Sequence, residues 1–343
     1  FMEADLVCGN GDRKAILDNV LKLLDGHERI VAIAPHAKGE RFEELPVERF
    51  ETHTRAFIKV EDGCNRQCAY CVIPRARGPV RSRAEASILN ELHQLAAAGY
   101  REVVLSAISL PSYGLDTGTN LVELVEKCAQ VEGIQRIRLG SLDPDMLTPE
   151  FITRLAAVEK LCPQFHLSLQ SGCTATLRRM RRVYTAEQYA KVVADLRAAY
   201  GERPVSFTTD CICGFPGETV ADFEESCAFL KEIGFLKVHV FPYSRRSGTP
   251  AYDFPDQVHE REKQDRSRKM NALAEDIRRD VLKGYEGMED EVLLETPLSE
   301  TLFTGYTRLY VPVVVSAPGH KSGEIVRVRL GAYDGERVRA ALC

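Results

Sequence analysis

Three cysteines in the first quarter of the chain have the spacing of a metal-cluster ligand set. Cys64, Cys68 and Cys71 are separated by three and then by two residues, within the run DGCNRQCAYC. Three thiolates on a four-iron cluster would leave one iron without a protein ligand. An iron with an open position can hold a small chelating ligand and pass it an electron, whereas a four-cysteine cluster only relays electrons. The spacing therefore favours redox chemistry on a bound ligand.

The residue before the last cysteine adds to this pattern. Tyr70, an aromatic at that position, gives the motif a form that resembles the radical S-adenosylmethionine (SAM) enzymes. The resemblance implies that SAM chelates the open iron and is cleaved by one electron to methionine and a 5′-deoxyadenosyl radical. Such a radical takes hydrogen from unactivated C–H bonds, which acid–base catalysis cannot do.

A structural zinc site is the main alternative for these cysteines, and it would need a fourth Cys or His nearby. The nearest candidates are His53, which precedes an expected strand, and His93, which falls within an expected helix. Neither lies in a short metal-binding knuckle. A disulfide framework is also disfavoured, because the count of eleven cysteines is odd and shows no paired spacing.

The composition is that of an ordinary globular protein with more than one domain. Of 343 residues, 44% are hydrophobic and 28% charged, and no apolar run approaches the ~20 residues of a membrane span. We expect a cytoplasmic location, where cysteines stay reduced and available for metal. The net charge of −5 argues against a general nucleic-acid coat protein. Two arginine clusters could still bind phosphate: Arg75, Arg77, Arg81 and Arg83, and Arg178, Arg179, Arg181 and Arg182.

The elements that must position the cysteines alternate between short apolar runs and amphipathic helical patterns. The expected strands are residues 56–60, 102–108, 136–140, 165–170, 205–211 and 235–241. The expected helices between them are residues 84–98, 121–130, 149–158, 186–200 and 220–233. Six such units in series predict an α/β fold, a partial (β/α)6 barrel resembling an incomplete TIM barrel. Functional residues in such a sheet gather at the C-terminal strand ends.

Other motifs also follow expected strand ends, so we predict that they face the same cavity as the cysteines. The glycines of the run GFPGE let a backbone approach a flat adenine, although such a run is often only a turn. Asp210 could accept from ribose hydroxyls, and Arg182 could clamp a carboxylate unless it is a plain surface arginine. The predicted SAM pocket comprises Tyr70, Gln170, Arg182, Asp210, Gly214, Gly217 and Glu218.

The remaining cysteines near these strands are expected to be small packing residues. Cys211 and Cys213 are expected on opposite faces of their strand, which argues against a second metal site between them. The other cysteines with this expectation are Cys128, Cys162, Cys173, Cys227 and Cys343.

The two ends of the chain differ in character from its middle. Residues 257–283 have helical spacing without Pro or Gly and predict one long helix. Beyond it, residues 291–295, 309–316 and 324–330 alternate like strands between Pro and Gly turns, which predicts a small antiparallel β-barrel. The first 54 residues show a short apolar segment, a turn and a helix over residues 13–24, too little for an independent domain.

Six further segments resemble the methylthiotransferase family of radical SAM enzymes. They are FIKVEDGC, CVIPRARG, QSG, MRRVYT, GFPGET and YSRRSGTPA, and they follow the family's order over residues 57–251. The resemblance implies that sulfur is inserted at a C–H carbon and then methylated. One SAM would serve as the source of the radical and a second as the methyl donor.

The resemblance also implies a domain organisation. Residues 1–54 would be the remnant of an N-terminal domain and its linker, 55–255 the radical SAM core, 256–287 a connecting helix and 288–343 an RNA-binding domain of the type called TRAM. The family's N-terminal domain carries three further cysteines for a second 4Fe–4S cluster. We do not find these ligands here, because Cys8 stands where the family usually has an apolar residue. From this chain we expect one 4Fe–4S cluster and reductive cleavage of SAM.

Two loops bear on the substrate. The loop GSLDP at residues 140–144 is most similar to the branch that modifies threonylcarbamoyladenosine beside the tRNA anticodon. The loop SAISLPSYG at residues 106–114 departs from the family's usual glycine-rich or polar sequence. The alternatives are the branches that act on isopentenyladenosine or on a ribosomal-protein aspartate, and a non-catalytic RNA-binding protein with structural zinc. The expected partners are the tRNA anticodon arm and an electron donor such as flavodoxin or ferredoxin. We do not expect the protein to bind a membrane.

Overall fold

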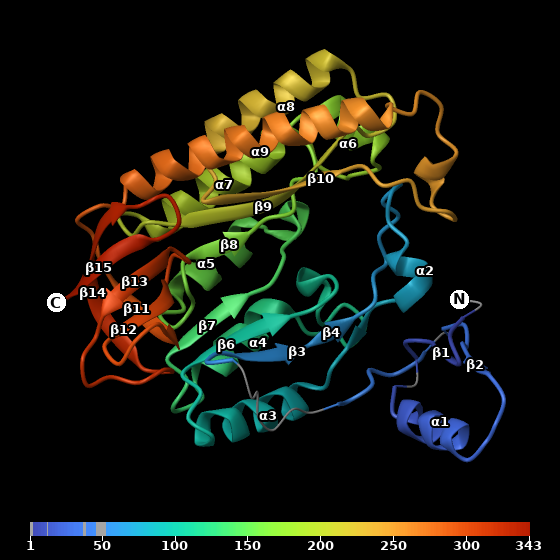
Figure 1. Ribbon diagram of the computed structural model, residues 1–343, viewed down its shortest axis with the longest axis horizontal. Helices are drawn as coiled ribbons and strands as arrows, with labels where there is room; N and C mark the ends of the chain where they lie inside the picture. The colour runs from blue at the N-terminus through green and yellow to red at the C-terminus, as the bar shows by residue number, and fades with distance from the viewer. Residues whose placement is uncertain (1–2, 12, 37–38, 46–52) are drawn as a thin grey trace.

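Six parallel strands form the centre of the computed structural model, which describes residues 3–11, 13–36, 39–45 and 53–343 (Figure 1). Two sets of three strands are joined by single bridges from Ile137 to Leu161 and from Leu142 to Leu167, so the strands follow chain order. They are β3 (Ala56–Lys59), β6 (Glu102–Ser106), β7 (Arg136–Leu139), β8 (Gln164–His166), β9 (Ser206–Cys213) and β10 (Lys237–Pro242). The predicted α/β partial barrel is confirmed.

Helices on the connections between the strands pack against one face of the sheet and bury one continuous core. Their apolar faces contribute side chains such as Leu92, Val125 and Leu230, which are inaccessible to solvent. Thr185 and Thr219 begin two of the helices with a capping box, which satisfies backbone N–H groups of the first turn. The helices are α3 (Glu85–Ala97), α4 (Leu121–Ala129), α5 (Pro149–Ala157), α6 (Thr174–Arg179), α7 (Ala186–Tyr200) and α8 (Val220–Ile233).

Three short elements frame the loop that carries the three cysteines. Strand β4 (Glu61–Asp62) pairs antiparallel with β5 (Arg81–Ser82), and helix α2 (Ile73–Arg77) lies between them in the chain. The pairing closes the base of the loop because Asp62 lies opposite Arg81. Single 3₁₀ turns at Leu110–Ser112 and Pro144–Met146 follow strands β6 and β7 at the same end of the sheet.

A long helix connects the sheet to a closed barrel at the C-terminus. Helix α9 (Glu260–Lys283) lies beside α8 and leads into the barrel (Figure 1). The barrel order is β11-β12-β13-β15-β14. The sequence predicted an antiparallel barrel, and this is wrong for one pair, because β13 and β15 are parallel. The strands are β11 (Glu289–Pro297), β12 (Leu302–Thr307), β13 (Pro312–Ser316), β14 (Ile325–Tyr333) and β15 (Val338–Leu342).

The barrel docks at the amino-terminal ends of the parallel strands, opposite the cysteine loop (Figure 1). Arg138 of β7 donates to the carbonyl oxygens of Thr307 at 2.5 Å and Arg308 at 3.0 Å. Ser206 at the start of β9 donates to the carbonyl oxygen of Leu309 at 2.5 Å. Glu102 at the start of β6 binds Arg138 at 2.7 Å, so buried charge holds the junction together.

The first part of the chain forms a small unit of its own. Strand β1 (Leu6–Cys8) pairs in parallel with β2 (Ile30–Ala32), and helix α1 (Ala15–Leu24) connects them. In the part of the chain that the structure describes, no helix has both the length and the apolar composition needed to cross a membrane.

Candidate functional site

The three cysteines of the predicted cluster lie in the loop between β4 and α2, beyond the carboxyl end of β3. Cys64, Cys68 and Cys71 are half-buried free thiols. Among the described residues, the groups whose candidate ligand atoms all lie within 4.8 Å of one another do not include these three sulfurs. A single tetrahedral zinc, with bonds of about 2.3 Å, holds its sulfurs about 4 Å apart. A four-iron cluster instead binds each thiolate to a different iron, so it does not require the three sulfurs to lie that close together.

The two histidines considered as a fourth zinc ligand do not join the cysteines. His93 lies exposed on α3, and His53 packs its ring edge against Phe57 at 5.6 Å between ring centroids. The zinc alternative therefore gains no support from the described part of the chain.

Backbone hydrogen bonds attach the cysteine loop to loops that follow two other strands. Ala69 donates its N–H to the carbonyl oxygen of Met180 at 2.9 Å and accepts from the N–H of Ala251 at 2.8 Å. Ala69, Met180 and Ala251 are all fully buried. The position of the cysteines is therefore fixed by the chain after β8 and after β10, and not only by their own loop.

Gly63 allows the cysteine loop to pass close to its returning strand. Its φ of +98° is a conformation that residues with a side chain rarely adopt, and an added Cβ would lie 2.0 Å from the carbonyl oxygen of Pro79. Cys64, the next residue, donates its N–H to the carbonyl oxygen of Gly78 at 3.0 Å. A side chain at position 63 must therefore displace the first cluster ligand.

We expect Gly63→Ala to lower the iron bound after reconstitution to a small fraction of the wild-type amount. Gly99→Ala is the matched control, since Gly99 has a φ of +92° with nothing within 4 Å of an added Cβ. The control should lose only about 1–2 kcal/mol of stability from its backbone conformation and bind iron normally. Iron analysis and urea unfolding measure both effects. Equal iron content in the two variants would show that the close approach does not matter.

The loop after β9 lies against the cysteine loop through aromatic rings. Tyr70 meets Phe215 edge-to-face at 6.5 Å between ring centroids, and Phe215 in turn meets Tyr243 at 5.1 Å. Burial raises the pKa of the Tyr70 hydroxyl well above its ordinary value, so this side chain stays neutral. The structure therefore brings Tyr70 together with Gly214, which directly precedes Phe215 in the GFPGE run.

A buried ion pair fixes the shape of the GFPGE loop. Glu218 accepts from the N–H of Gly214 at 2.9 Å and from the guanidinium of Arg266 at 2.5 Å. Arg266 also donates to the carbonyl oxygen of Glu218 at 2.9 Å. Gly214 and Gly217 have φ values of +72° and +76°, which a glycine adopts without strain. Glu218 thus supports the predicted SAM pocket through its own loop.

Arg182 lies in the site, and the alternative of a surface arginine is wrong. Its side chain is 5% exposed and donates to Asp143 at 2.5 Å, to the hydroxyl of Tyr184 at 3.0 Å and to the sulfur of Cys68 at 3.2 Å. Asp143 also pairs with Arg66 at 3.3 Å. Burial raises the pKa of the Cys64 thiol and of the Cys71 thiol.

Gln170 and Asp210 lie beside each other, where the chain after β8 pairs with β9. Gln170 has a φ of +69°, uncommon for a residue with a side chain, and its N–H donates to the carbonyl oxygen of Asp210 at 2.9 Å. Asp210 precedes Gly214 by four residues of extended strand, roughly 13 Å. Its carboxylate lies 3.4 Å from the Nε2 atom of His166. The structure therefore does not bring Asp210 to the GFPGE loop, and its contact with ribose stays a prediction.

Sequence reasoning missed four residues that complete this site. Asp143 belongs to the GSLDP loop, which was singled out for substrate preference, so a signal for it existed. Arg66 lies between two of the cysteines, and Tyr184 lies two residues beyond Arg182. Arg266 had no signal, because its partner Glu218 is 48 residues away in the sequence.

Two expectations about charge and cysteine placement were wrong in part. Arg81 and Arg83 are buried; Arg81 donates to the carbonyl oxygen of Arg77 at 2.8 Å and Arg83 pairs with a carboxylate, so neither is available to phosphate. Cys211 and Cys213 share one face of β9, since side chains two residues apart on a strand point the same way. Both are fully buried, and burial raises the pKa of Cys213 to about 12, which fits inert packing residues.

Glu61, three residues before Cys64, is a buried carboxyl with a raised pKa. Burial raises its pKa from 4.5 to about 8, and the nearby Asp62 adds to this, while the N–H of Ser109 at 2.9 Å acts against it. The pKa in the folded state therefore exceeds that in the unfolded state. The protonated group favours folding fully below about pH 4.5, and this contribution is lost as pH rises towards 8.

We expect Glu61→Gln to remove this pH dependence, because the amide has the same shape and no charge. Between pH 5 and 8 the free energy of unfolding of the wild type should fall relative to the variant by up to about 1.4 kcal/mol per pH unit. Urea unfolding of both proteins at several pH values measures the difference. A constant difference across that range would contradict a buried, protonated Glu61.

Comparisons with known proteins agree with this geometry. A family model described as the radical SAM superfamily matches residues 58–230. The threonylcarbamoyladenosine tRNA methylthiotransferase MtaB of Bacillus subtilis is 37% identical over 332 residues, which cover 95% of this chain and 73% of that protein. The protein of the same name from Thermotoga maritima is 34% identical, with 98% and 76% covered.

A third relative has a different printed substrate. The tRNA-2-methylthio-N(6)-dimethylallyladenosine synthase of Carboxydothermus hydrogenoformans is 34% identical, covering 96% of this chain and 75% of that protein. All three relatives are therefore similar to this chain over most of both lengths. The chain belongs to the methylthiotransferase family of radical SAM enzymes.

Proposed function

We propose that this chain carries out the radical SAM chemistry of a tRNA methylthiotransferase whose substrate is threonylcarbamoyladenosine next to the anticodon. The observation that carries the proposal is its similarity, over 95% of its length, to the MtaB protein of Bacillus subtilis. The second MtaB relative adds support, while the similarity to a dimethylallyladenosine synthase keeps that nucleoside as the second candidate. The position of Asp143, beside Arg182, links the GSLDP loop to the predicted SAM pocket.

The proposed roles follow from the contacts described above. Cys64, Cys68 and Cys71 hold a 4Fe–4S cluster, which supplies one electron to SAM when both are bound. Arg182 contacts the sulfur of Cys68 at 3.2 Å and offers a guanidinium to the SAM carboxylate. Tyr70 shields the cluster side from water, because its ring is partly buried and packs on Phe215.

The loop after β9 receives the adenine in this proposal. Gly214 and Gly217 expose backbone, and Glu218, tied to Arg266, holds the turn in place. Gln170, which follows β8 and pairs with Cys211 of β9, lines the same pocket in this proposal. These assignments account for the predicted pocket residues other than Asp210.

RNA binding is assigned to the C-terminal barrel, and electron delivery to the surface around α2. The barrel is a closed five-stranded unit, of the size expected for a TRAM domain, and it lies beside a cavity with several cationic side chains. Arg75 is exposed on α2, close to the cysteine loop, where an acidic carrier of the flavodoxin or ferredoxin type would find opposite charge.

Hydrogen transfer from the substrate tests the nucleoside assignment directly. The cluster-loaded chain would receive SAM, dithionite and an anticodon-arm RNA deuterated at C2 of its modified adenosine. We expect deuterium to appear in 5′-deoxyadenosine with threonylcarbamoyladenosine RNA and several-fold less with the isopentenyladenosine RNA. The reverse preference would assign the chain to the second candidate. Cleavage of SAM without deuterium transfer from either RNA would reject a tRNA substrate at C2.

A further inference from the structure

The inner face of the sheet carries a second group of metal-ligating side chains, separate from the cysteine loop. His166 ends β8, Asp210 lies in β9 and His239 lies in β10. One nitrogen from each histidine and one carboxylate oxygen all lie within 4.8 Å of one another. His166 Nε2 is 3.4 Å from Asp210 Oδ2, and the two imidazole rings are 6.0 Å apart between centroids.

The register of the three strands explains why these side chains converge. His239 lies opposite Asp210 in the β9–β10 pairing, and His166 lies opposite Thr208 in the β8–β9 pairing. Thr208 and Asp210 are two residues apart, so both point to the same face of β9. Three adjacent strands therefore present His166, Asp210 and His239 on one side of the sheet, and a one-residue shift of any strand would separate them.

The orientation of His166 is the second observation. Its Nδ1 atom forms a hydrogen bond with the Thr208 hydroxyl at 3.0 Å. This leaves Nε2, the atom nearest Asp210, buried and without a hydrogen-bond partner among the described residues. A buried ring nitrogen without a hydrogen bond is unfavourable unless something else binds it. Histidines that bind metals are commonly fixed in this way, through a hydrogen bond to the other ring nitrogen.

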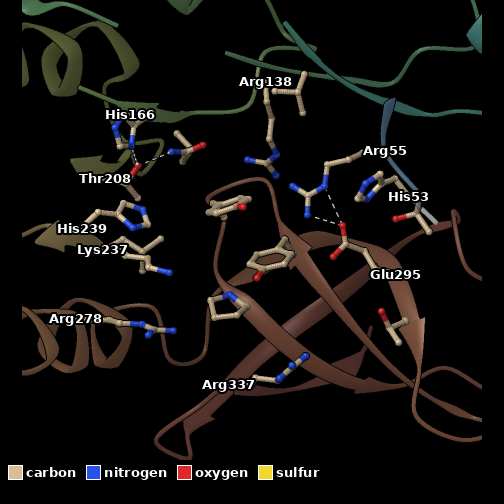
Figure 2. Close-up of a pocket in the computed structure, with 18 of the residues that line it drawn as sticks. His53, Arg55, Arg138, His166, Thr208, Lys237, His239, Arg278, Glu295 and Arg337 are labelled. Carbon is tan, nitrogen blue, oxygen red and sulfur yellow. Dashed lines mark hydrogen bonds and ion pairs between the residues drawn. The ribbon is translucent and has the colours of Figure 1, made fainter. Parts of the chain in front are cut away.

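A cavity provides the space that a bound ion and its further ligand would need. It has a volume of about 760 Å³ and lies between the sheet and the C-terminal barrel. Figure 2 shows His166, Thr208 and His239 on one wall of this cavity, with Lys237 next to them. Three protein ligands with an open position towards a cavity are the arrangement of a zinc site that binds a further ligand, rather than of a closed structural site.

The lowered pKa of His239 suits a neutral imidazole ligand, whereas the cationic side chains that line the cavity, Lys237 among them, act against a bound cation. Burial lowers the pKa of His239. The nearby Lys237 and His166 lower this pKa further, whereas Asp210 raises it. A histidine must be neutral to bind a metal ion. Lys237 is the cation nearest along β10, and its side chain is exposed, so it can point into solvent when an ion binds.

We propose that His166, Asp210 and His239 bind one divalent transition-metal ion of the zinc or ferrous class, with an open position facing the cavity. Two imidazoles and one carboxylate form a nitrogen and oxygen ligand set, whereas the cysteine loop offers sulfur alone. In this proposal Asp210 is a metal ligand, which is an alternative to the ribose contact predicted for it. It does not depend on which nucleoside the enzyme modifies.

Calorimetric titration of the full, cluster-loaded chain with Zn²⁺ tests the site, since its cluster thiolates are then occupied. We expect one equivalent bound by the wild type and by His93→Gln, whose histidine lies exposed on α3. Asp210→Asn, which keeps the side-chain shape, should lose that equivalent. Equal binding by the wild type and Asp210→Asn would overturn the proposal. Circular dichroism checks that the variants are folded.

A milder variant tests the same site without removing a ligand. Thr208→Val keeps the volume of the side chain but cannot hold His166 Nδ1. We expect it to weaken Zn²⁺ binding by about 10- to 100-fold while the stoichiometry stays at one. Unchanged affinity in Thr208→Val would mean that the bound zinc does not use His166, which would also overturn the proposal.

Discussion

Cys68→Ala should abolish the formation of 5′-deoxyadenosine and leave the fold intact. Cys68 is the central residue of the motif and the one whose sulfur contacts Arg182 at 3.2 Å. Without it the cluster has two protein ligands, and a four-iron cluster with two thiolates is not retained. The expected result is a loss of at least several hundredfold in the rate of SAM cleavage under dithionite, measured by chromatography, together with most of the bound iron.

Cys343→Ala is the control for this experiment. Cys343 is the exposed last residue of the chain, so its removal takes away a thiol without touching the cysteine loop. We expect full iron content and full cleavage of SAM in that variant. If Cys68→Ala retained SAM cleavage, the three-cysteine cluster would be refuted, whatever the relatives of this chain do.

Glu102→Gln should cost about 3–5 kcal/mol of stability, the largest effect that we expect from a single buried charge. Glu102 is 1% exposed, and it lies 2.7 Å from Arg138 and 3.4 Å from Arg136. Removing its charge leaves the buried guanidinium of Arg138 without this carboxylate and leaves Arg136 with only the half-exposed Glu291 at 3.4 Å. Urea unfolding measures the loss, and the matched control is Glu85→Gln, which breaks the exposed pair with Lys127 and should cost less than about 1 kcal/mol.

The pH dependence of this network has the opposite sign to that of Glu61. Burial alone would raise the pKa of Glu102. The guanidinium groups of Arg138, Arg136 and Arg55 outweigh burial and hold this pKa below its ordinary value of 4.5. Its contribution is therefore complete above about pH 4.5 and is lost as pH falls through the lowered pKa. The difference in stability between wild type and Glu102→Gln should accordingly shrink in acid. A cost no larger than that of Glu85→Gln would contradict the network.

The sequence predicted the order of the parallel sheet because each strand and its helix are local patterns. The six expected strands each overlap an observed strand, and the helix expected at residues 186–200 is α7 with the same limits. The strands β12 and β15 of the barrel were missed. Strand β12 includes Gly305, whose added Cβ would lie 2.1 Å from the carbonyl oxygen of Leu293. The glycine is therefore required by the close approach of two strands, and it does not fit the side-chain alternation by which strands are predicted.

The candidate site could be predicted where its residues share a loop and not where distant strands meet. The cysteine spacing and the GFPGE run are contiguous, and both were found. His166 and His239 lie on separate strands, and their approach depends on the register of β8, β9 and β10. Asp210 was predicted to bind SAM because it lies only four residues before Gly214 in the sequence. In an extended strand these four residues span roughly 13 Å, a distance that closeness in sequence does not reveal.

The junction between the sheet and the C-terminal barrel has a consequence for how these two units could be exchanged between proteins. Arg138 and Ser206 bind the barrel through the carbonyl oxygens of residues 307–309. Every amino acid has a carbonyl oxygen, so these three bonds recognise the path of the turn and not its side chains. A barrel of different sequence grafted onto this sheet can keep those three bonds if the turn keeps its backbone shape, but it must also supply side chains such as Glu295 and Arg308, which bind the sheet.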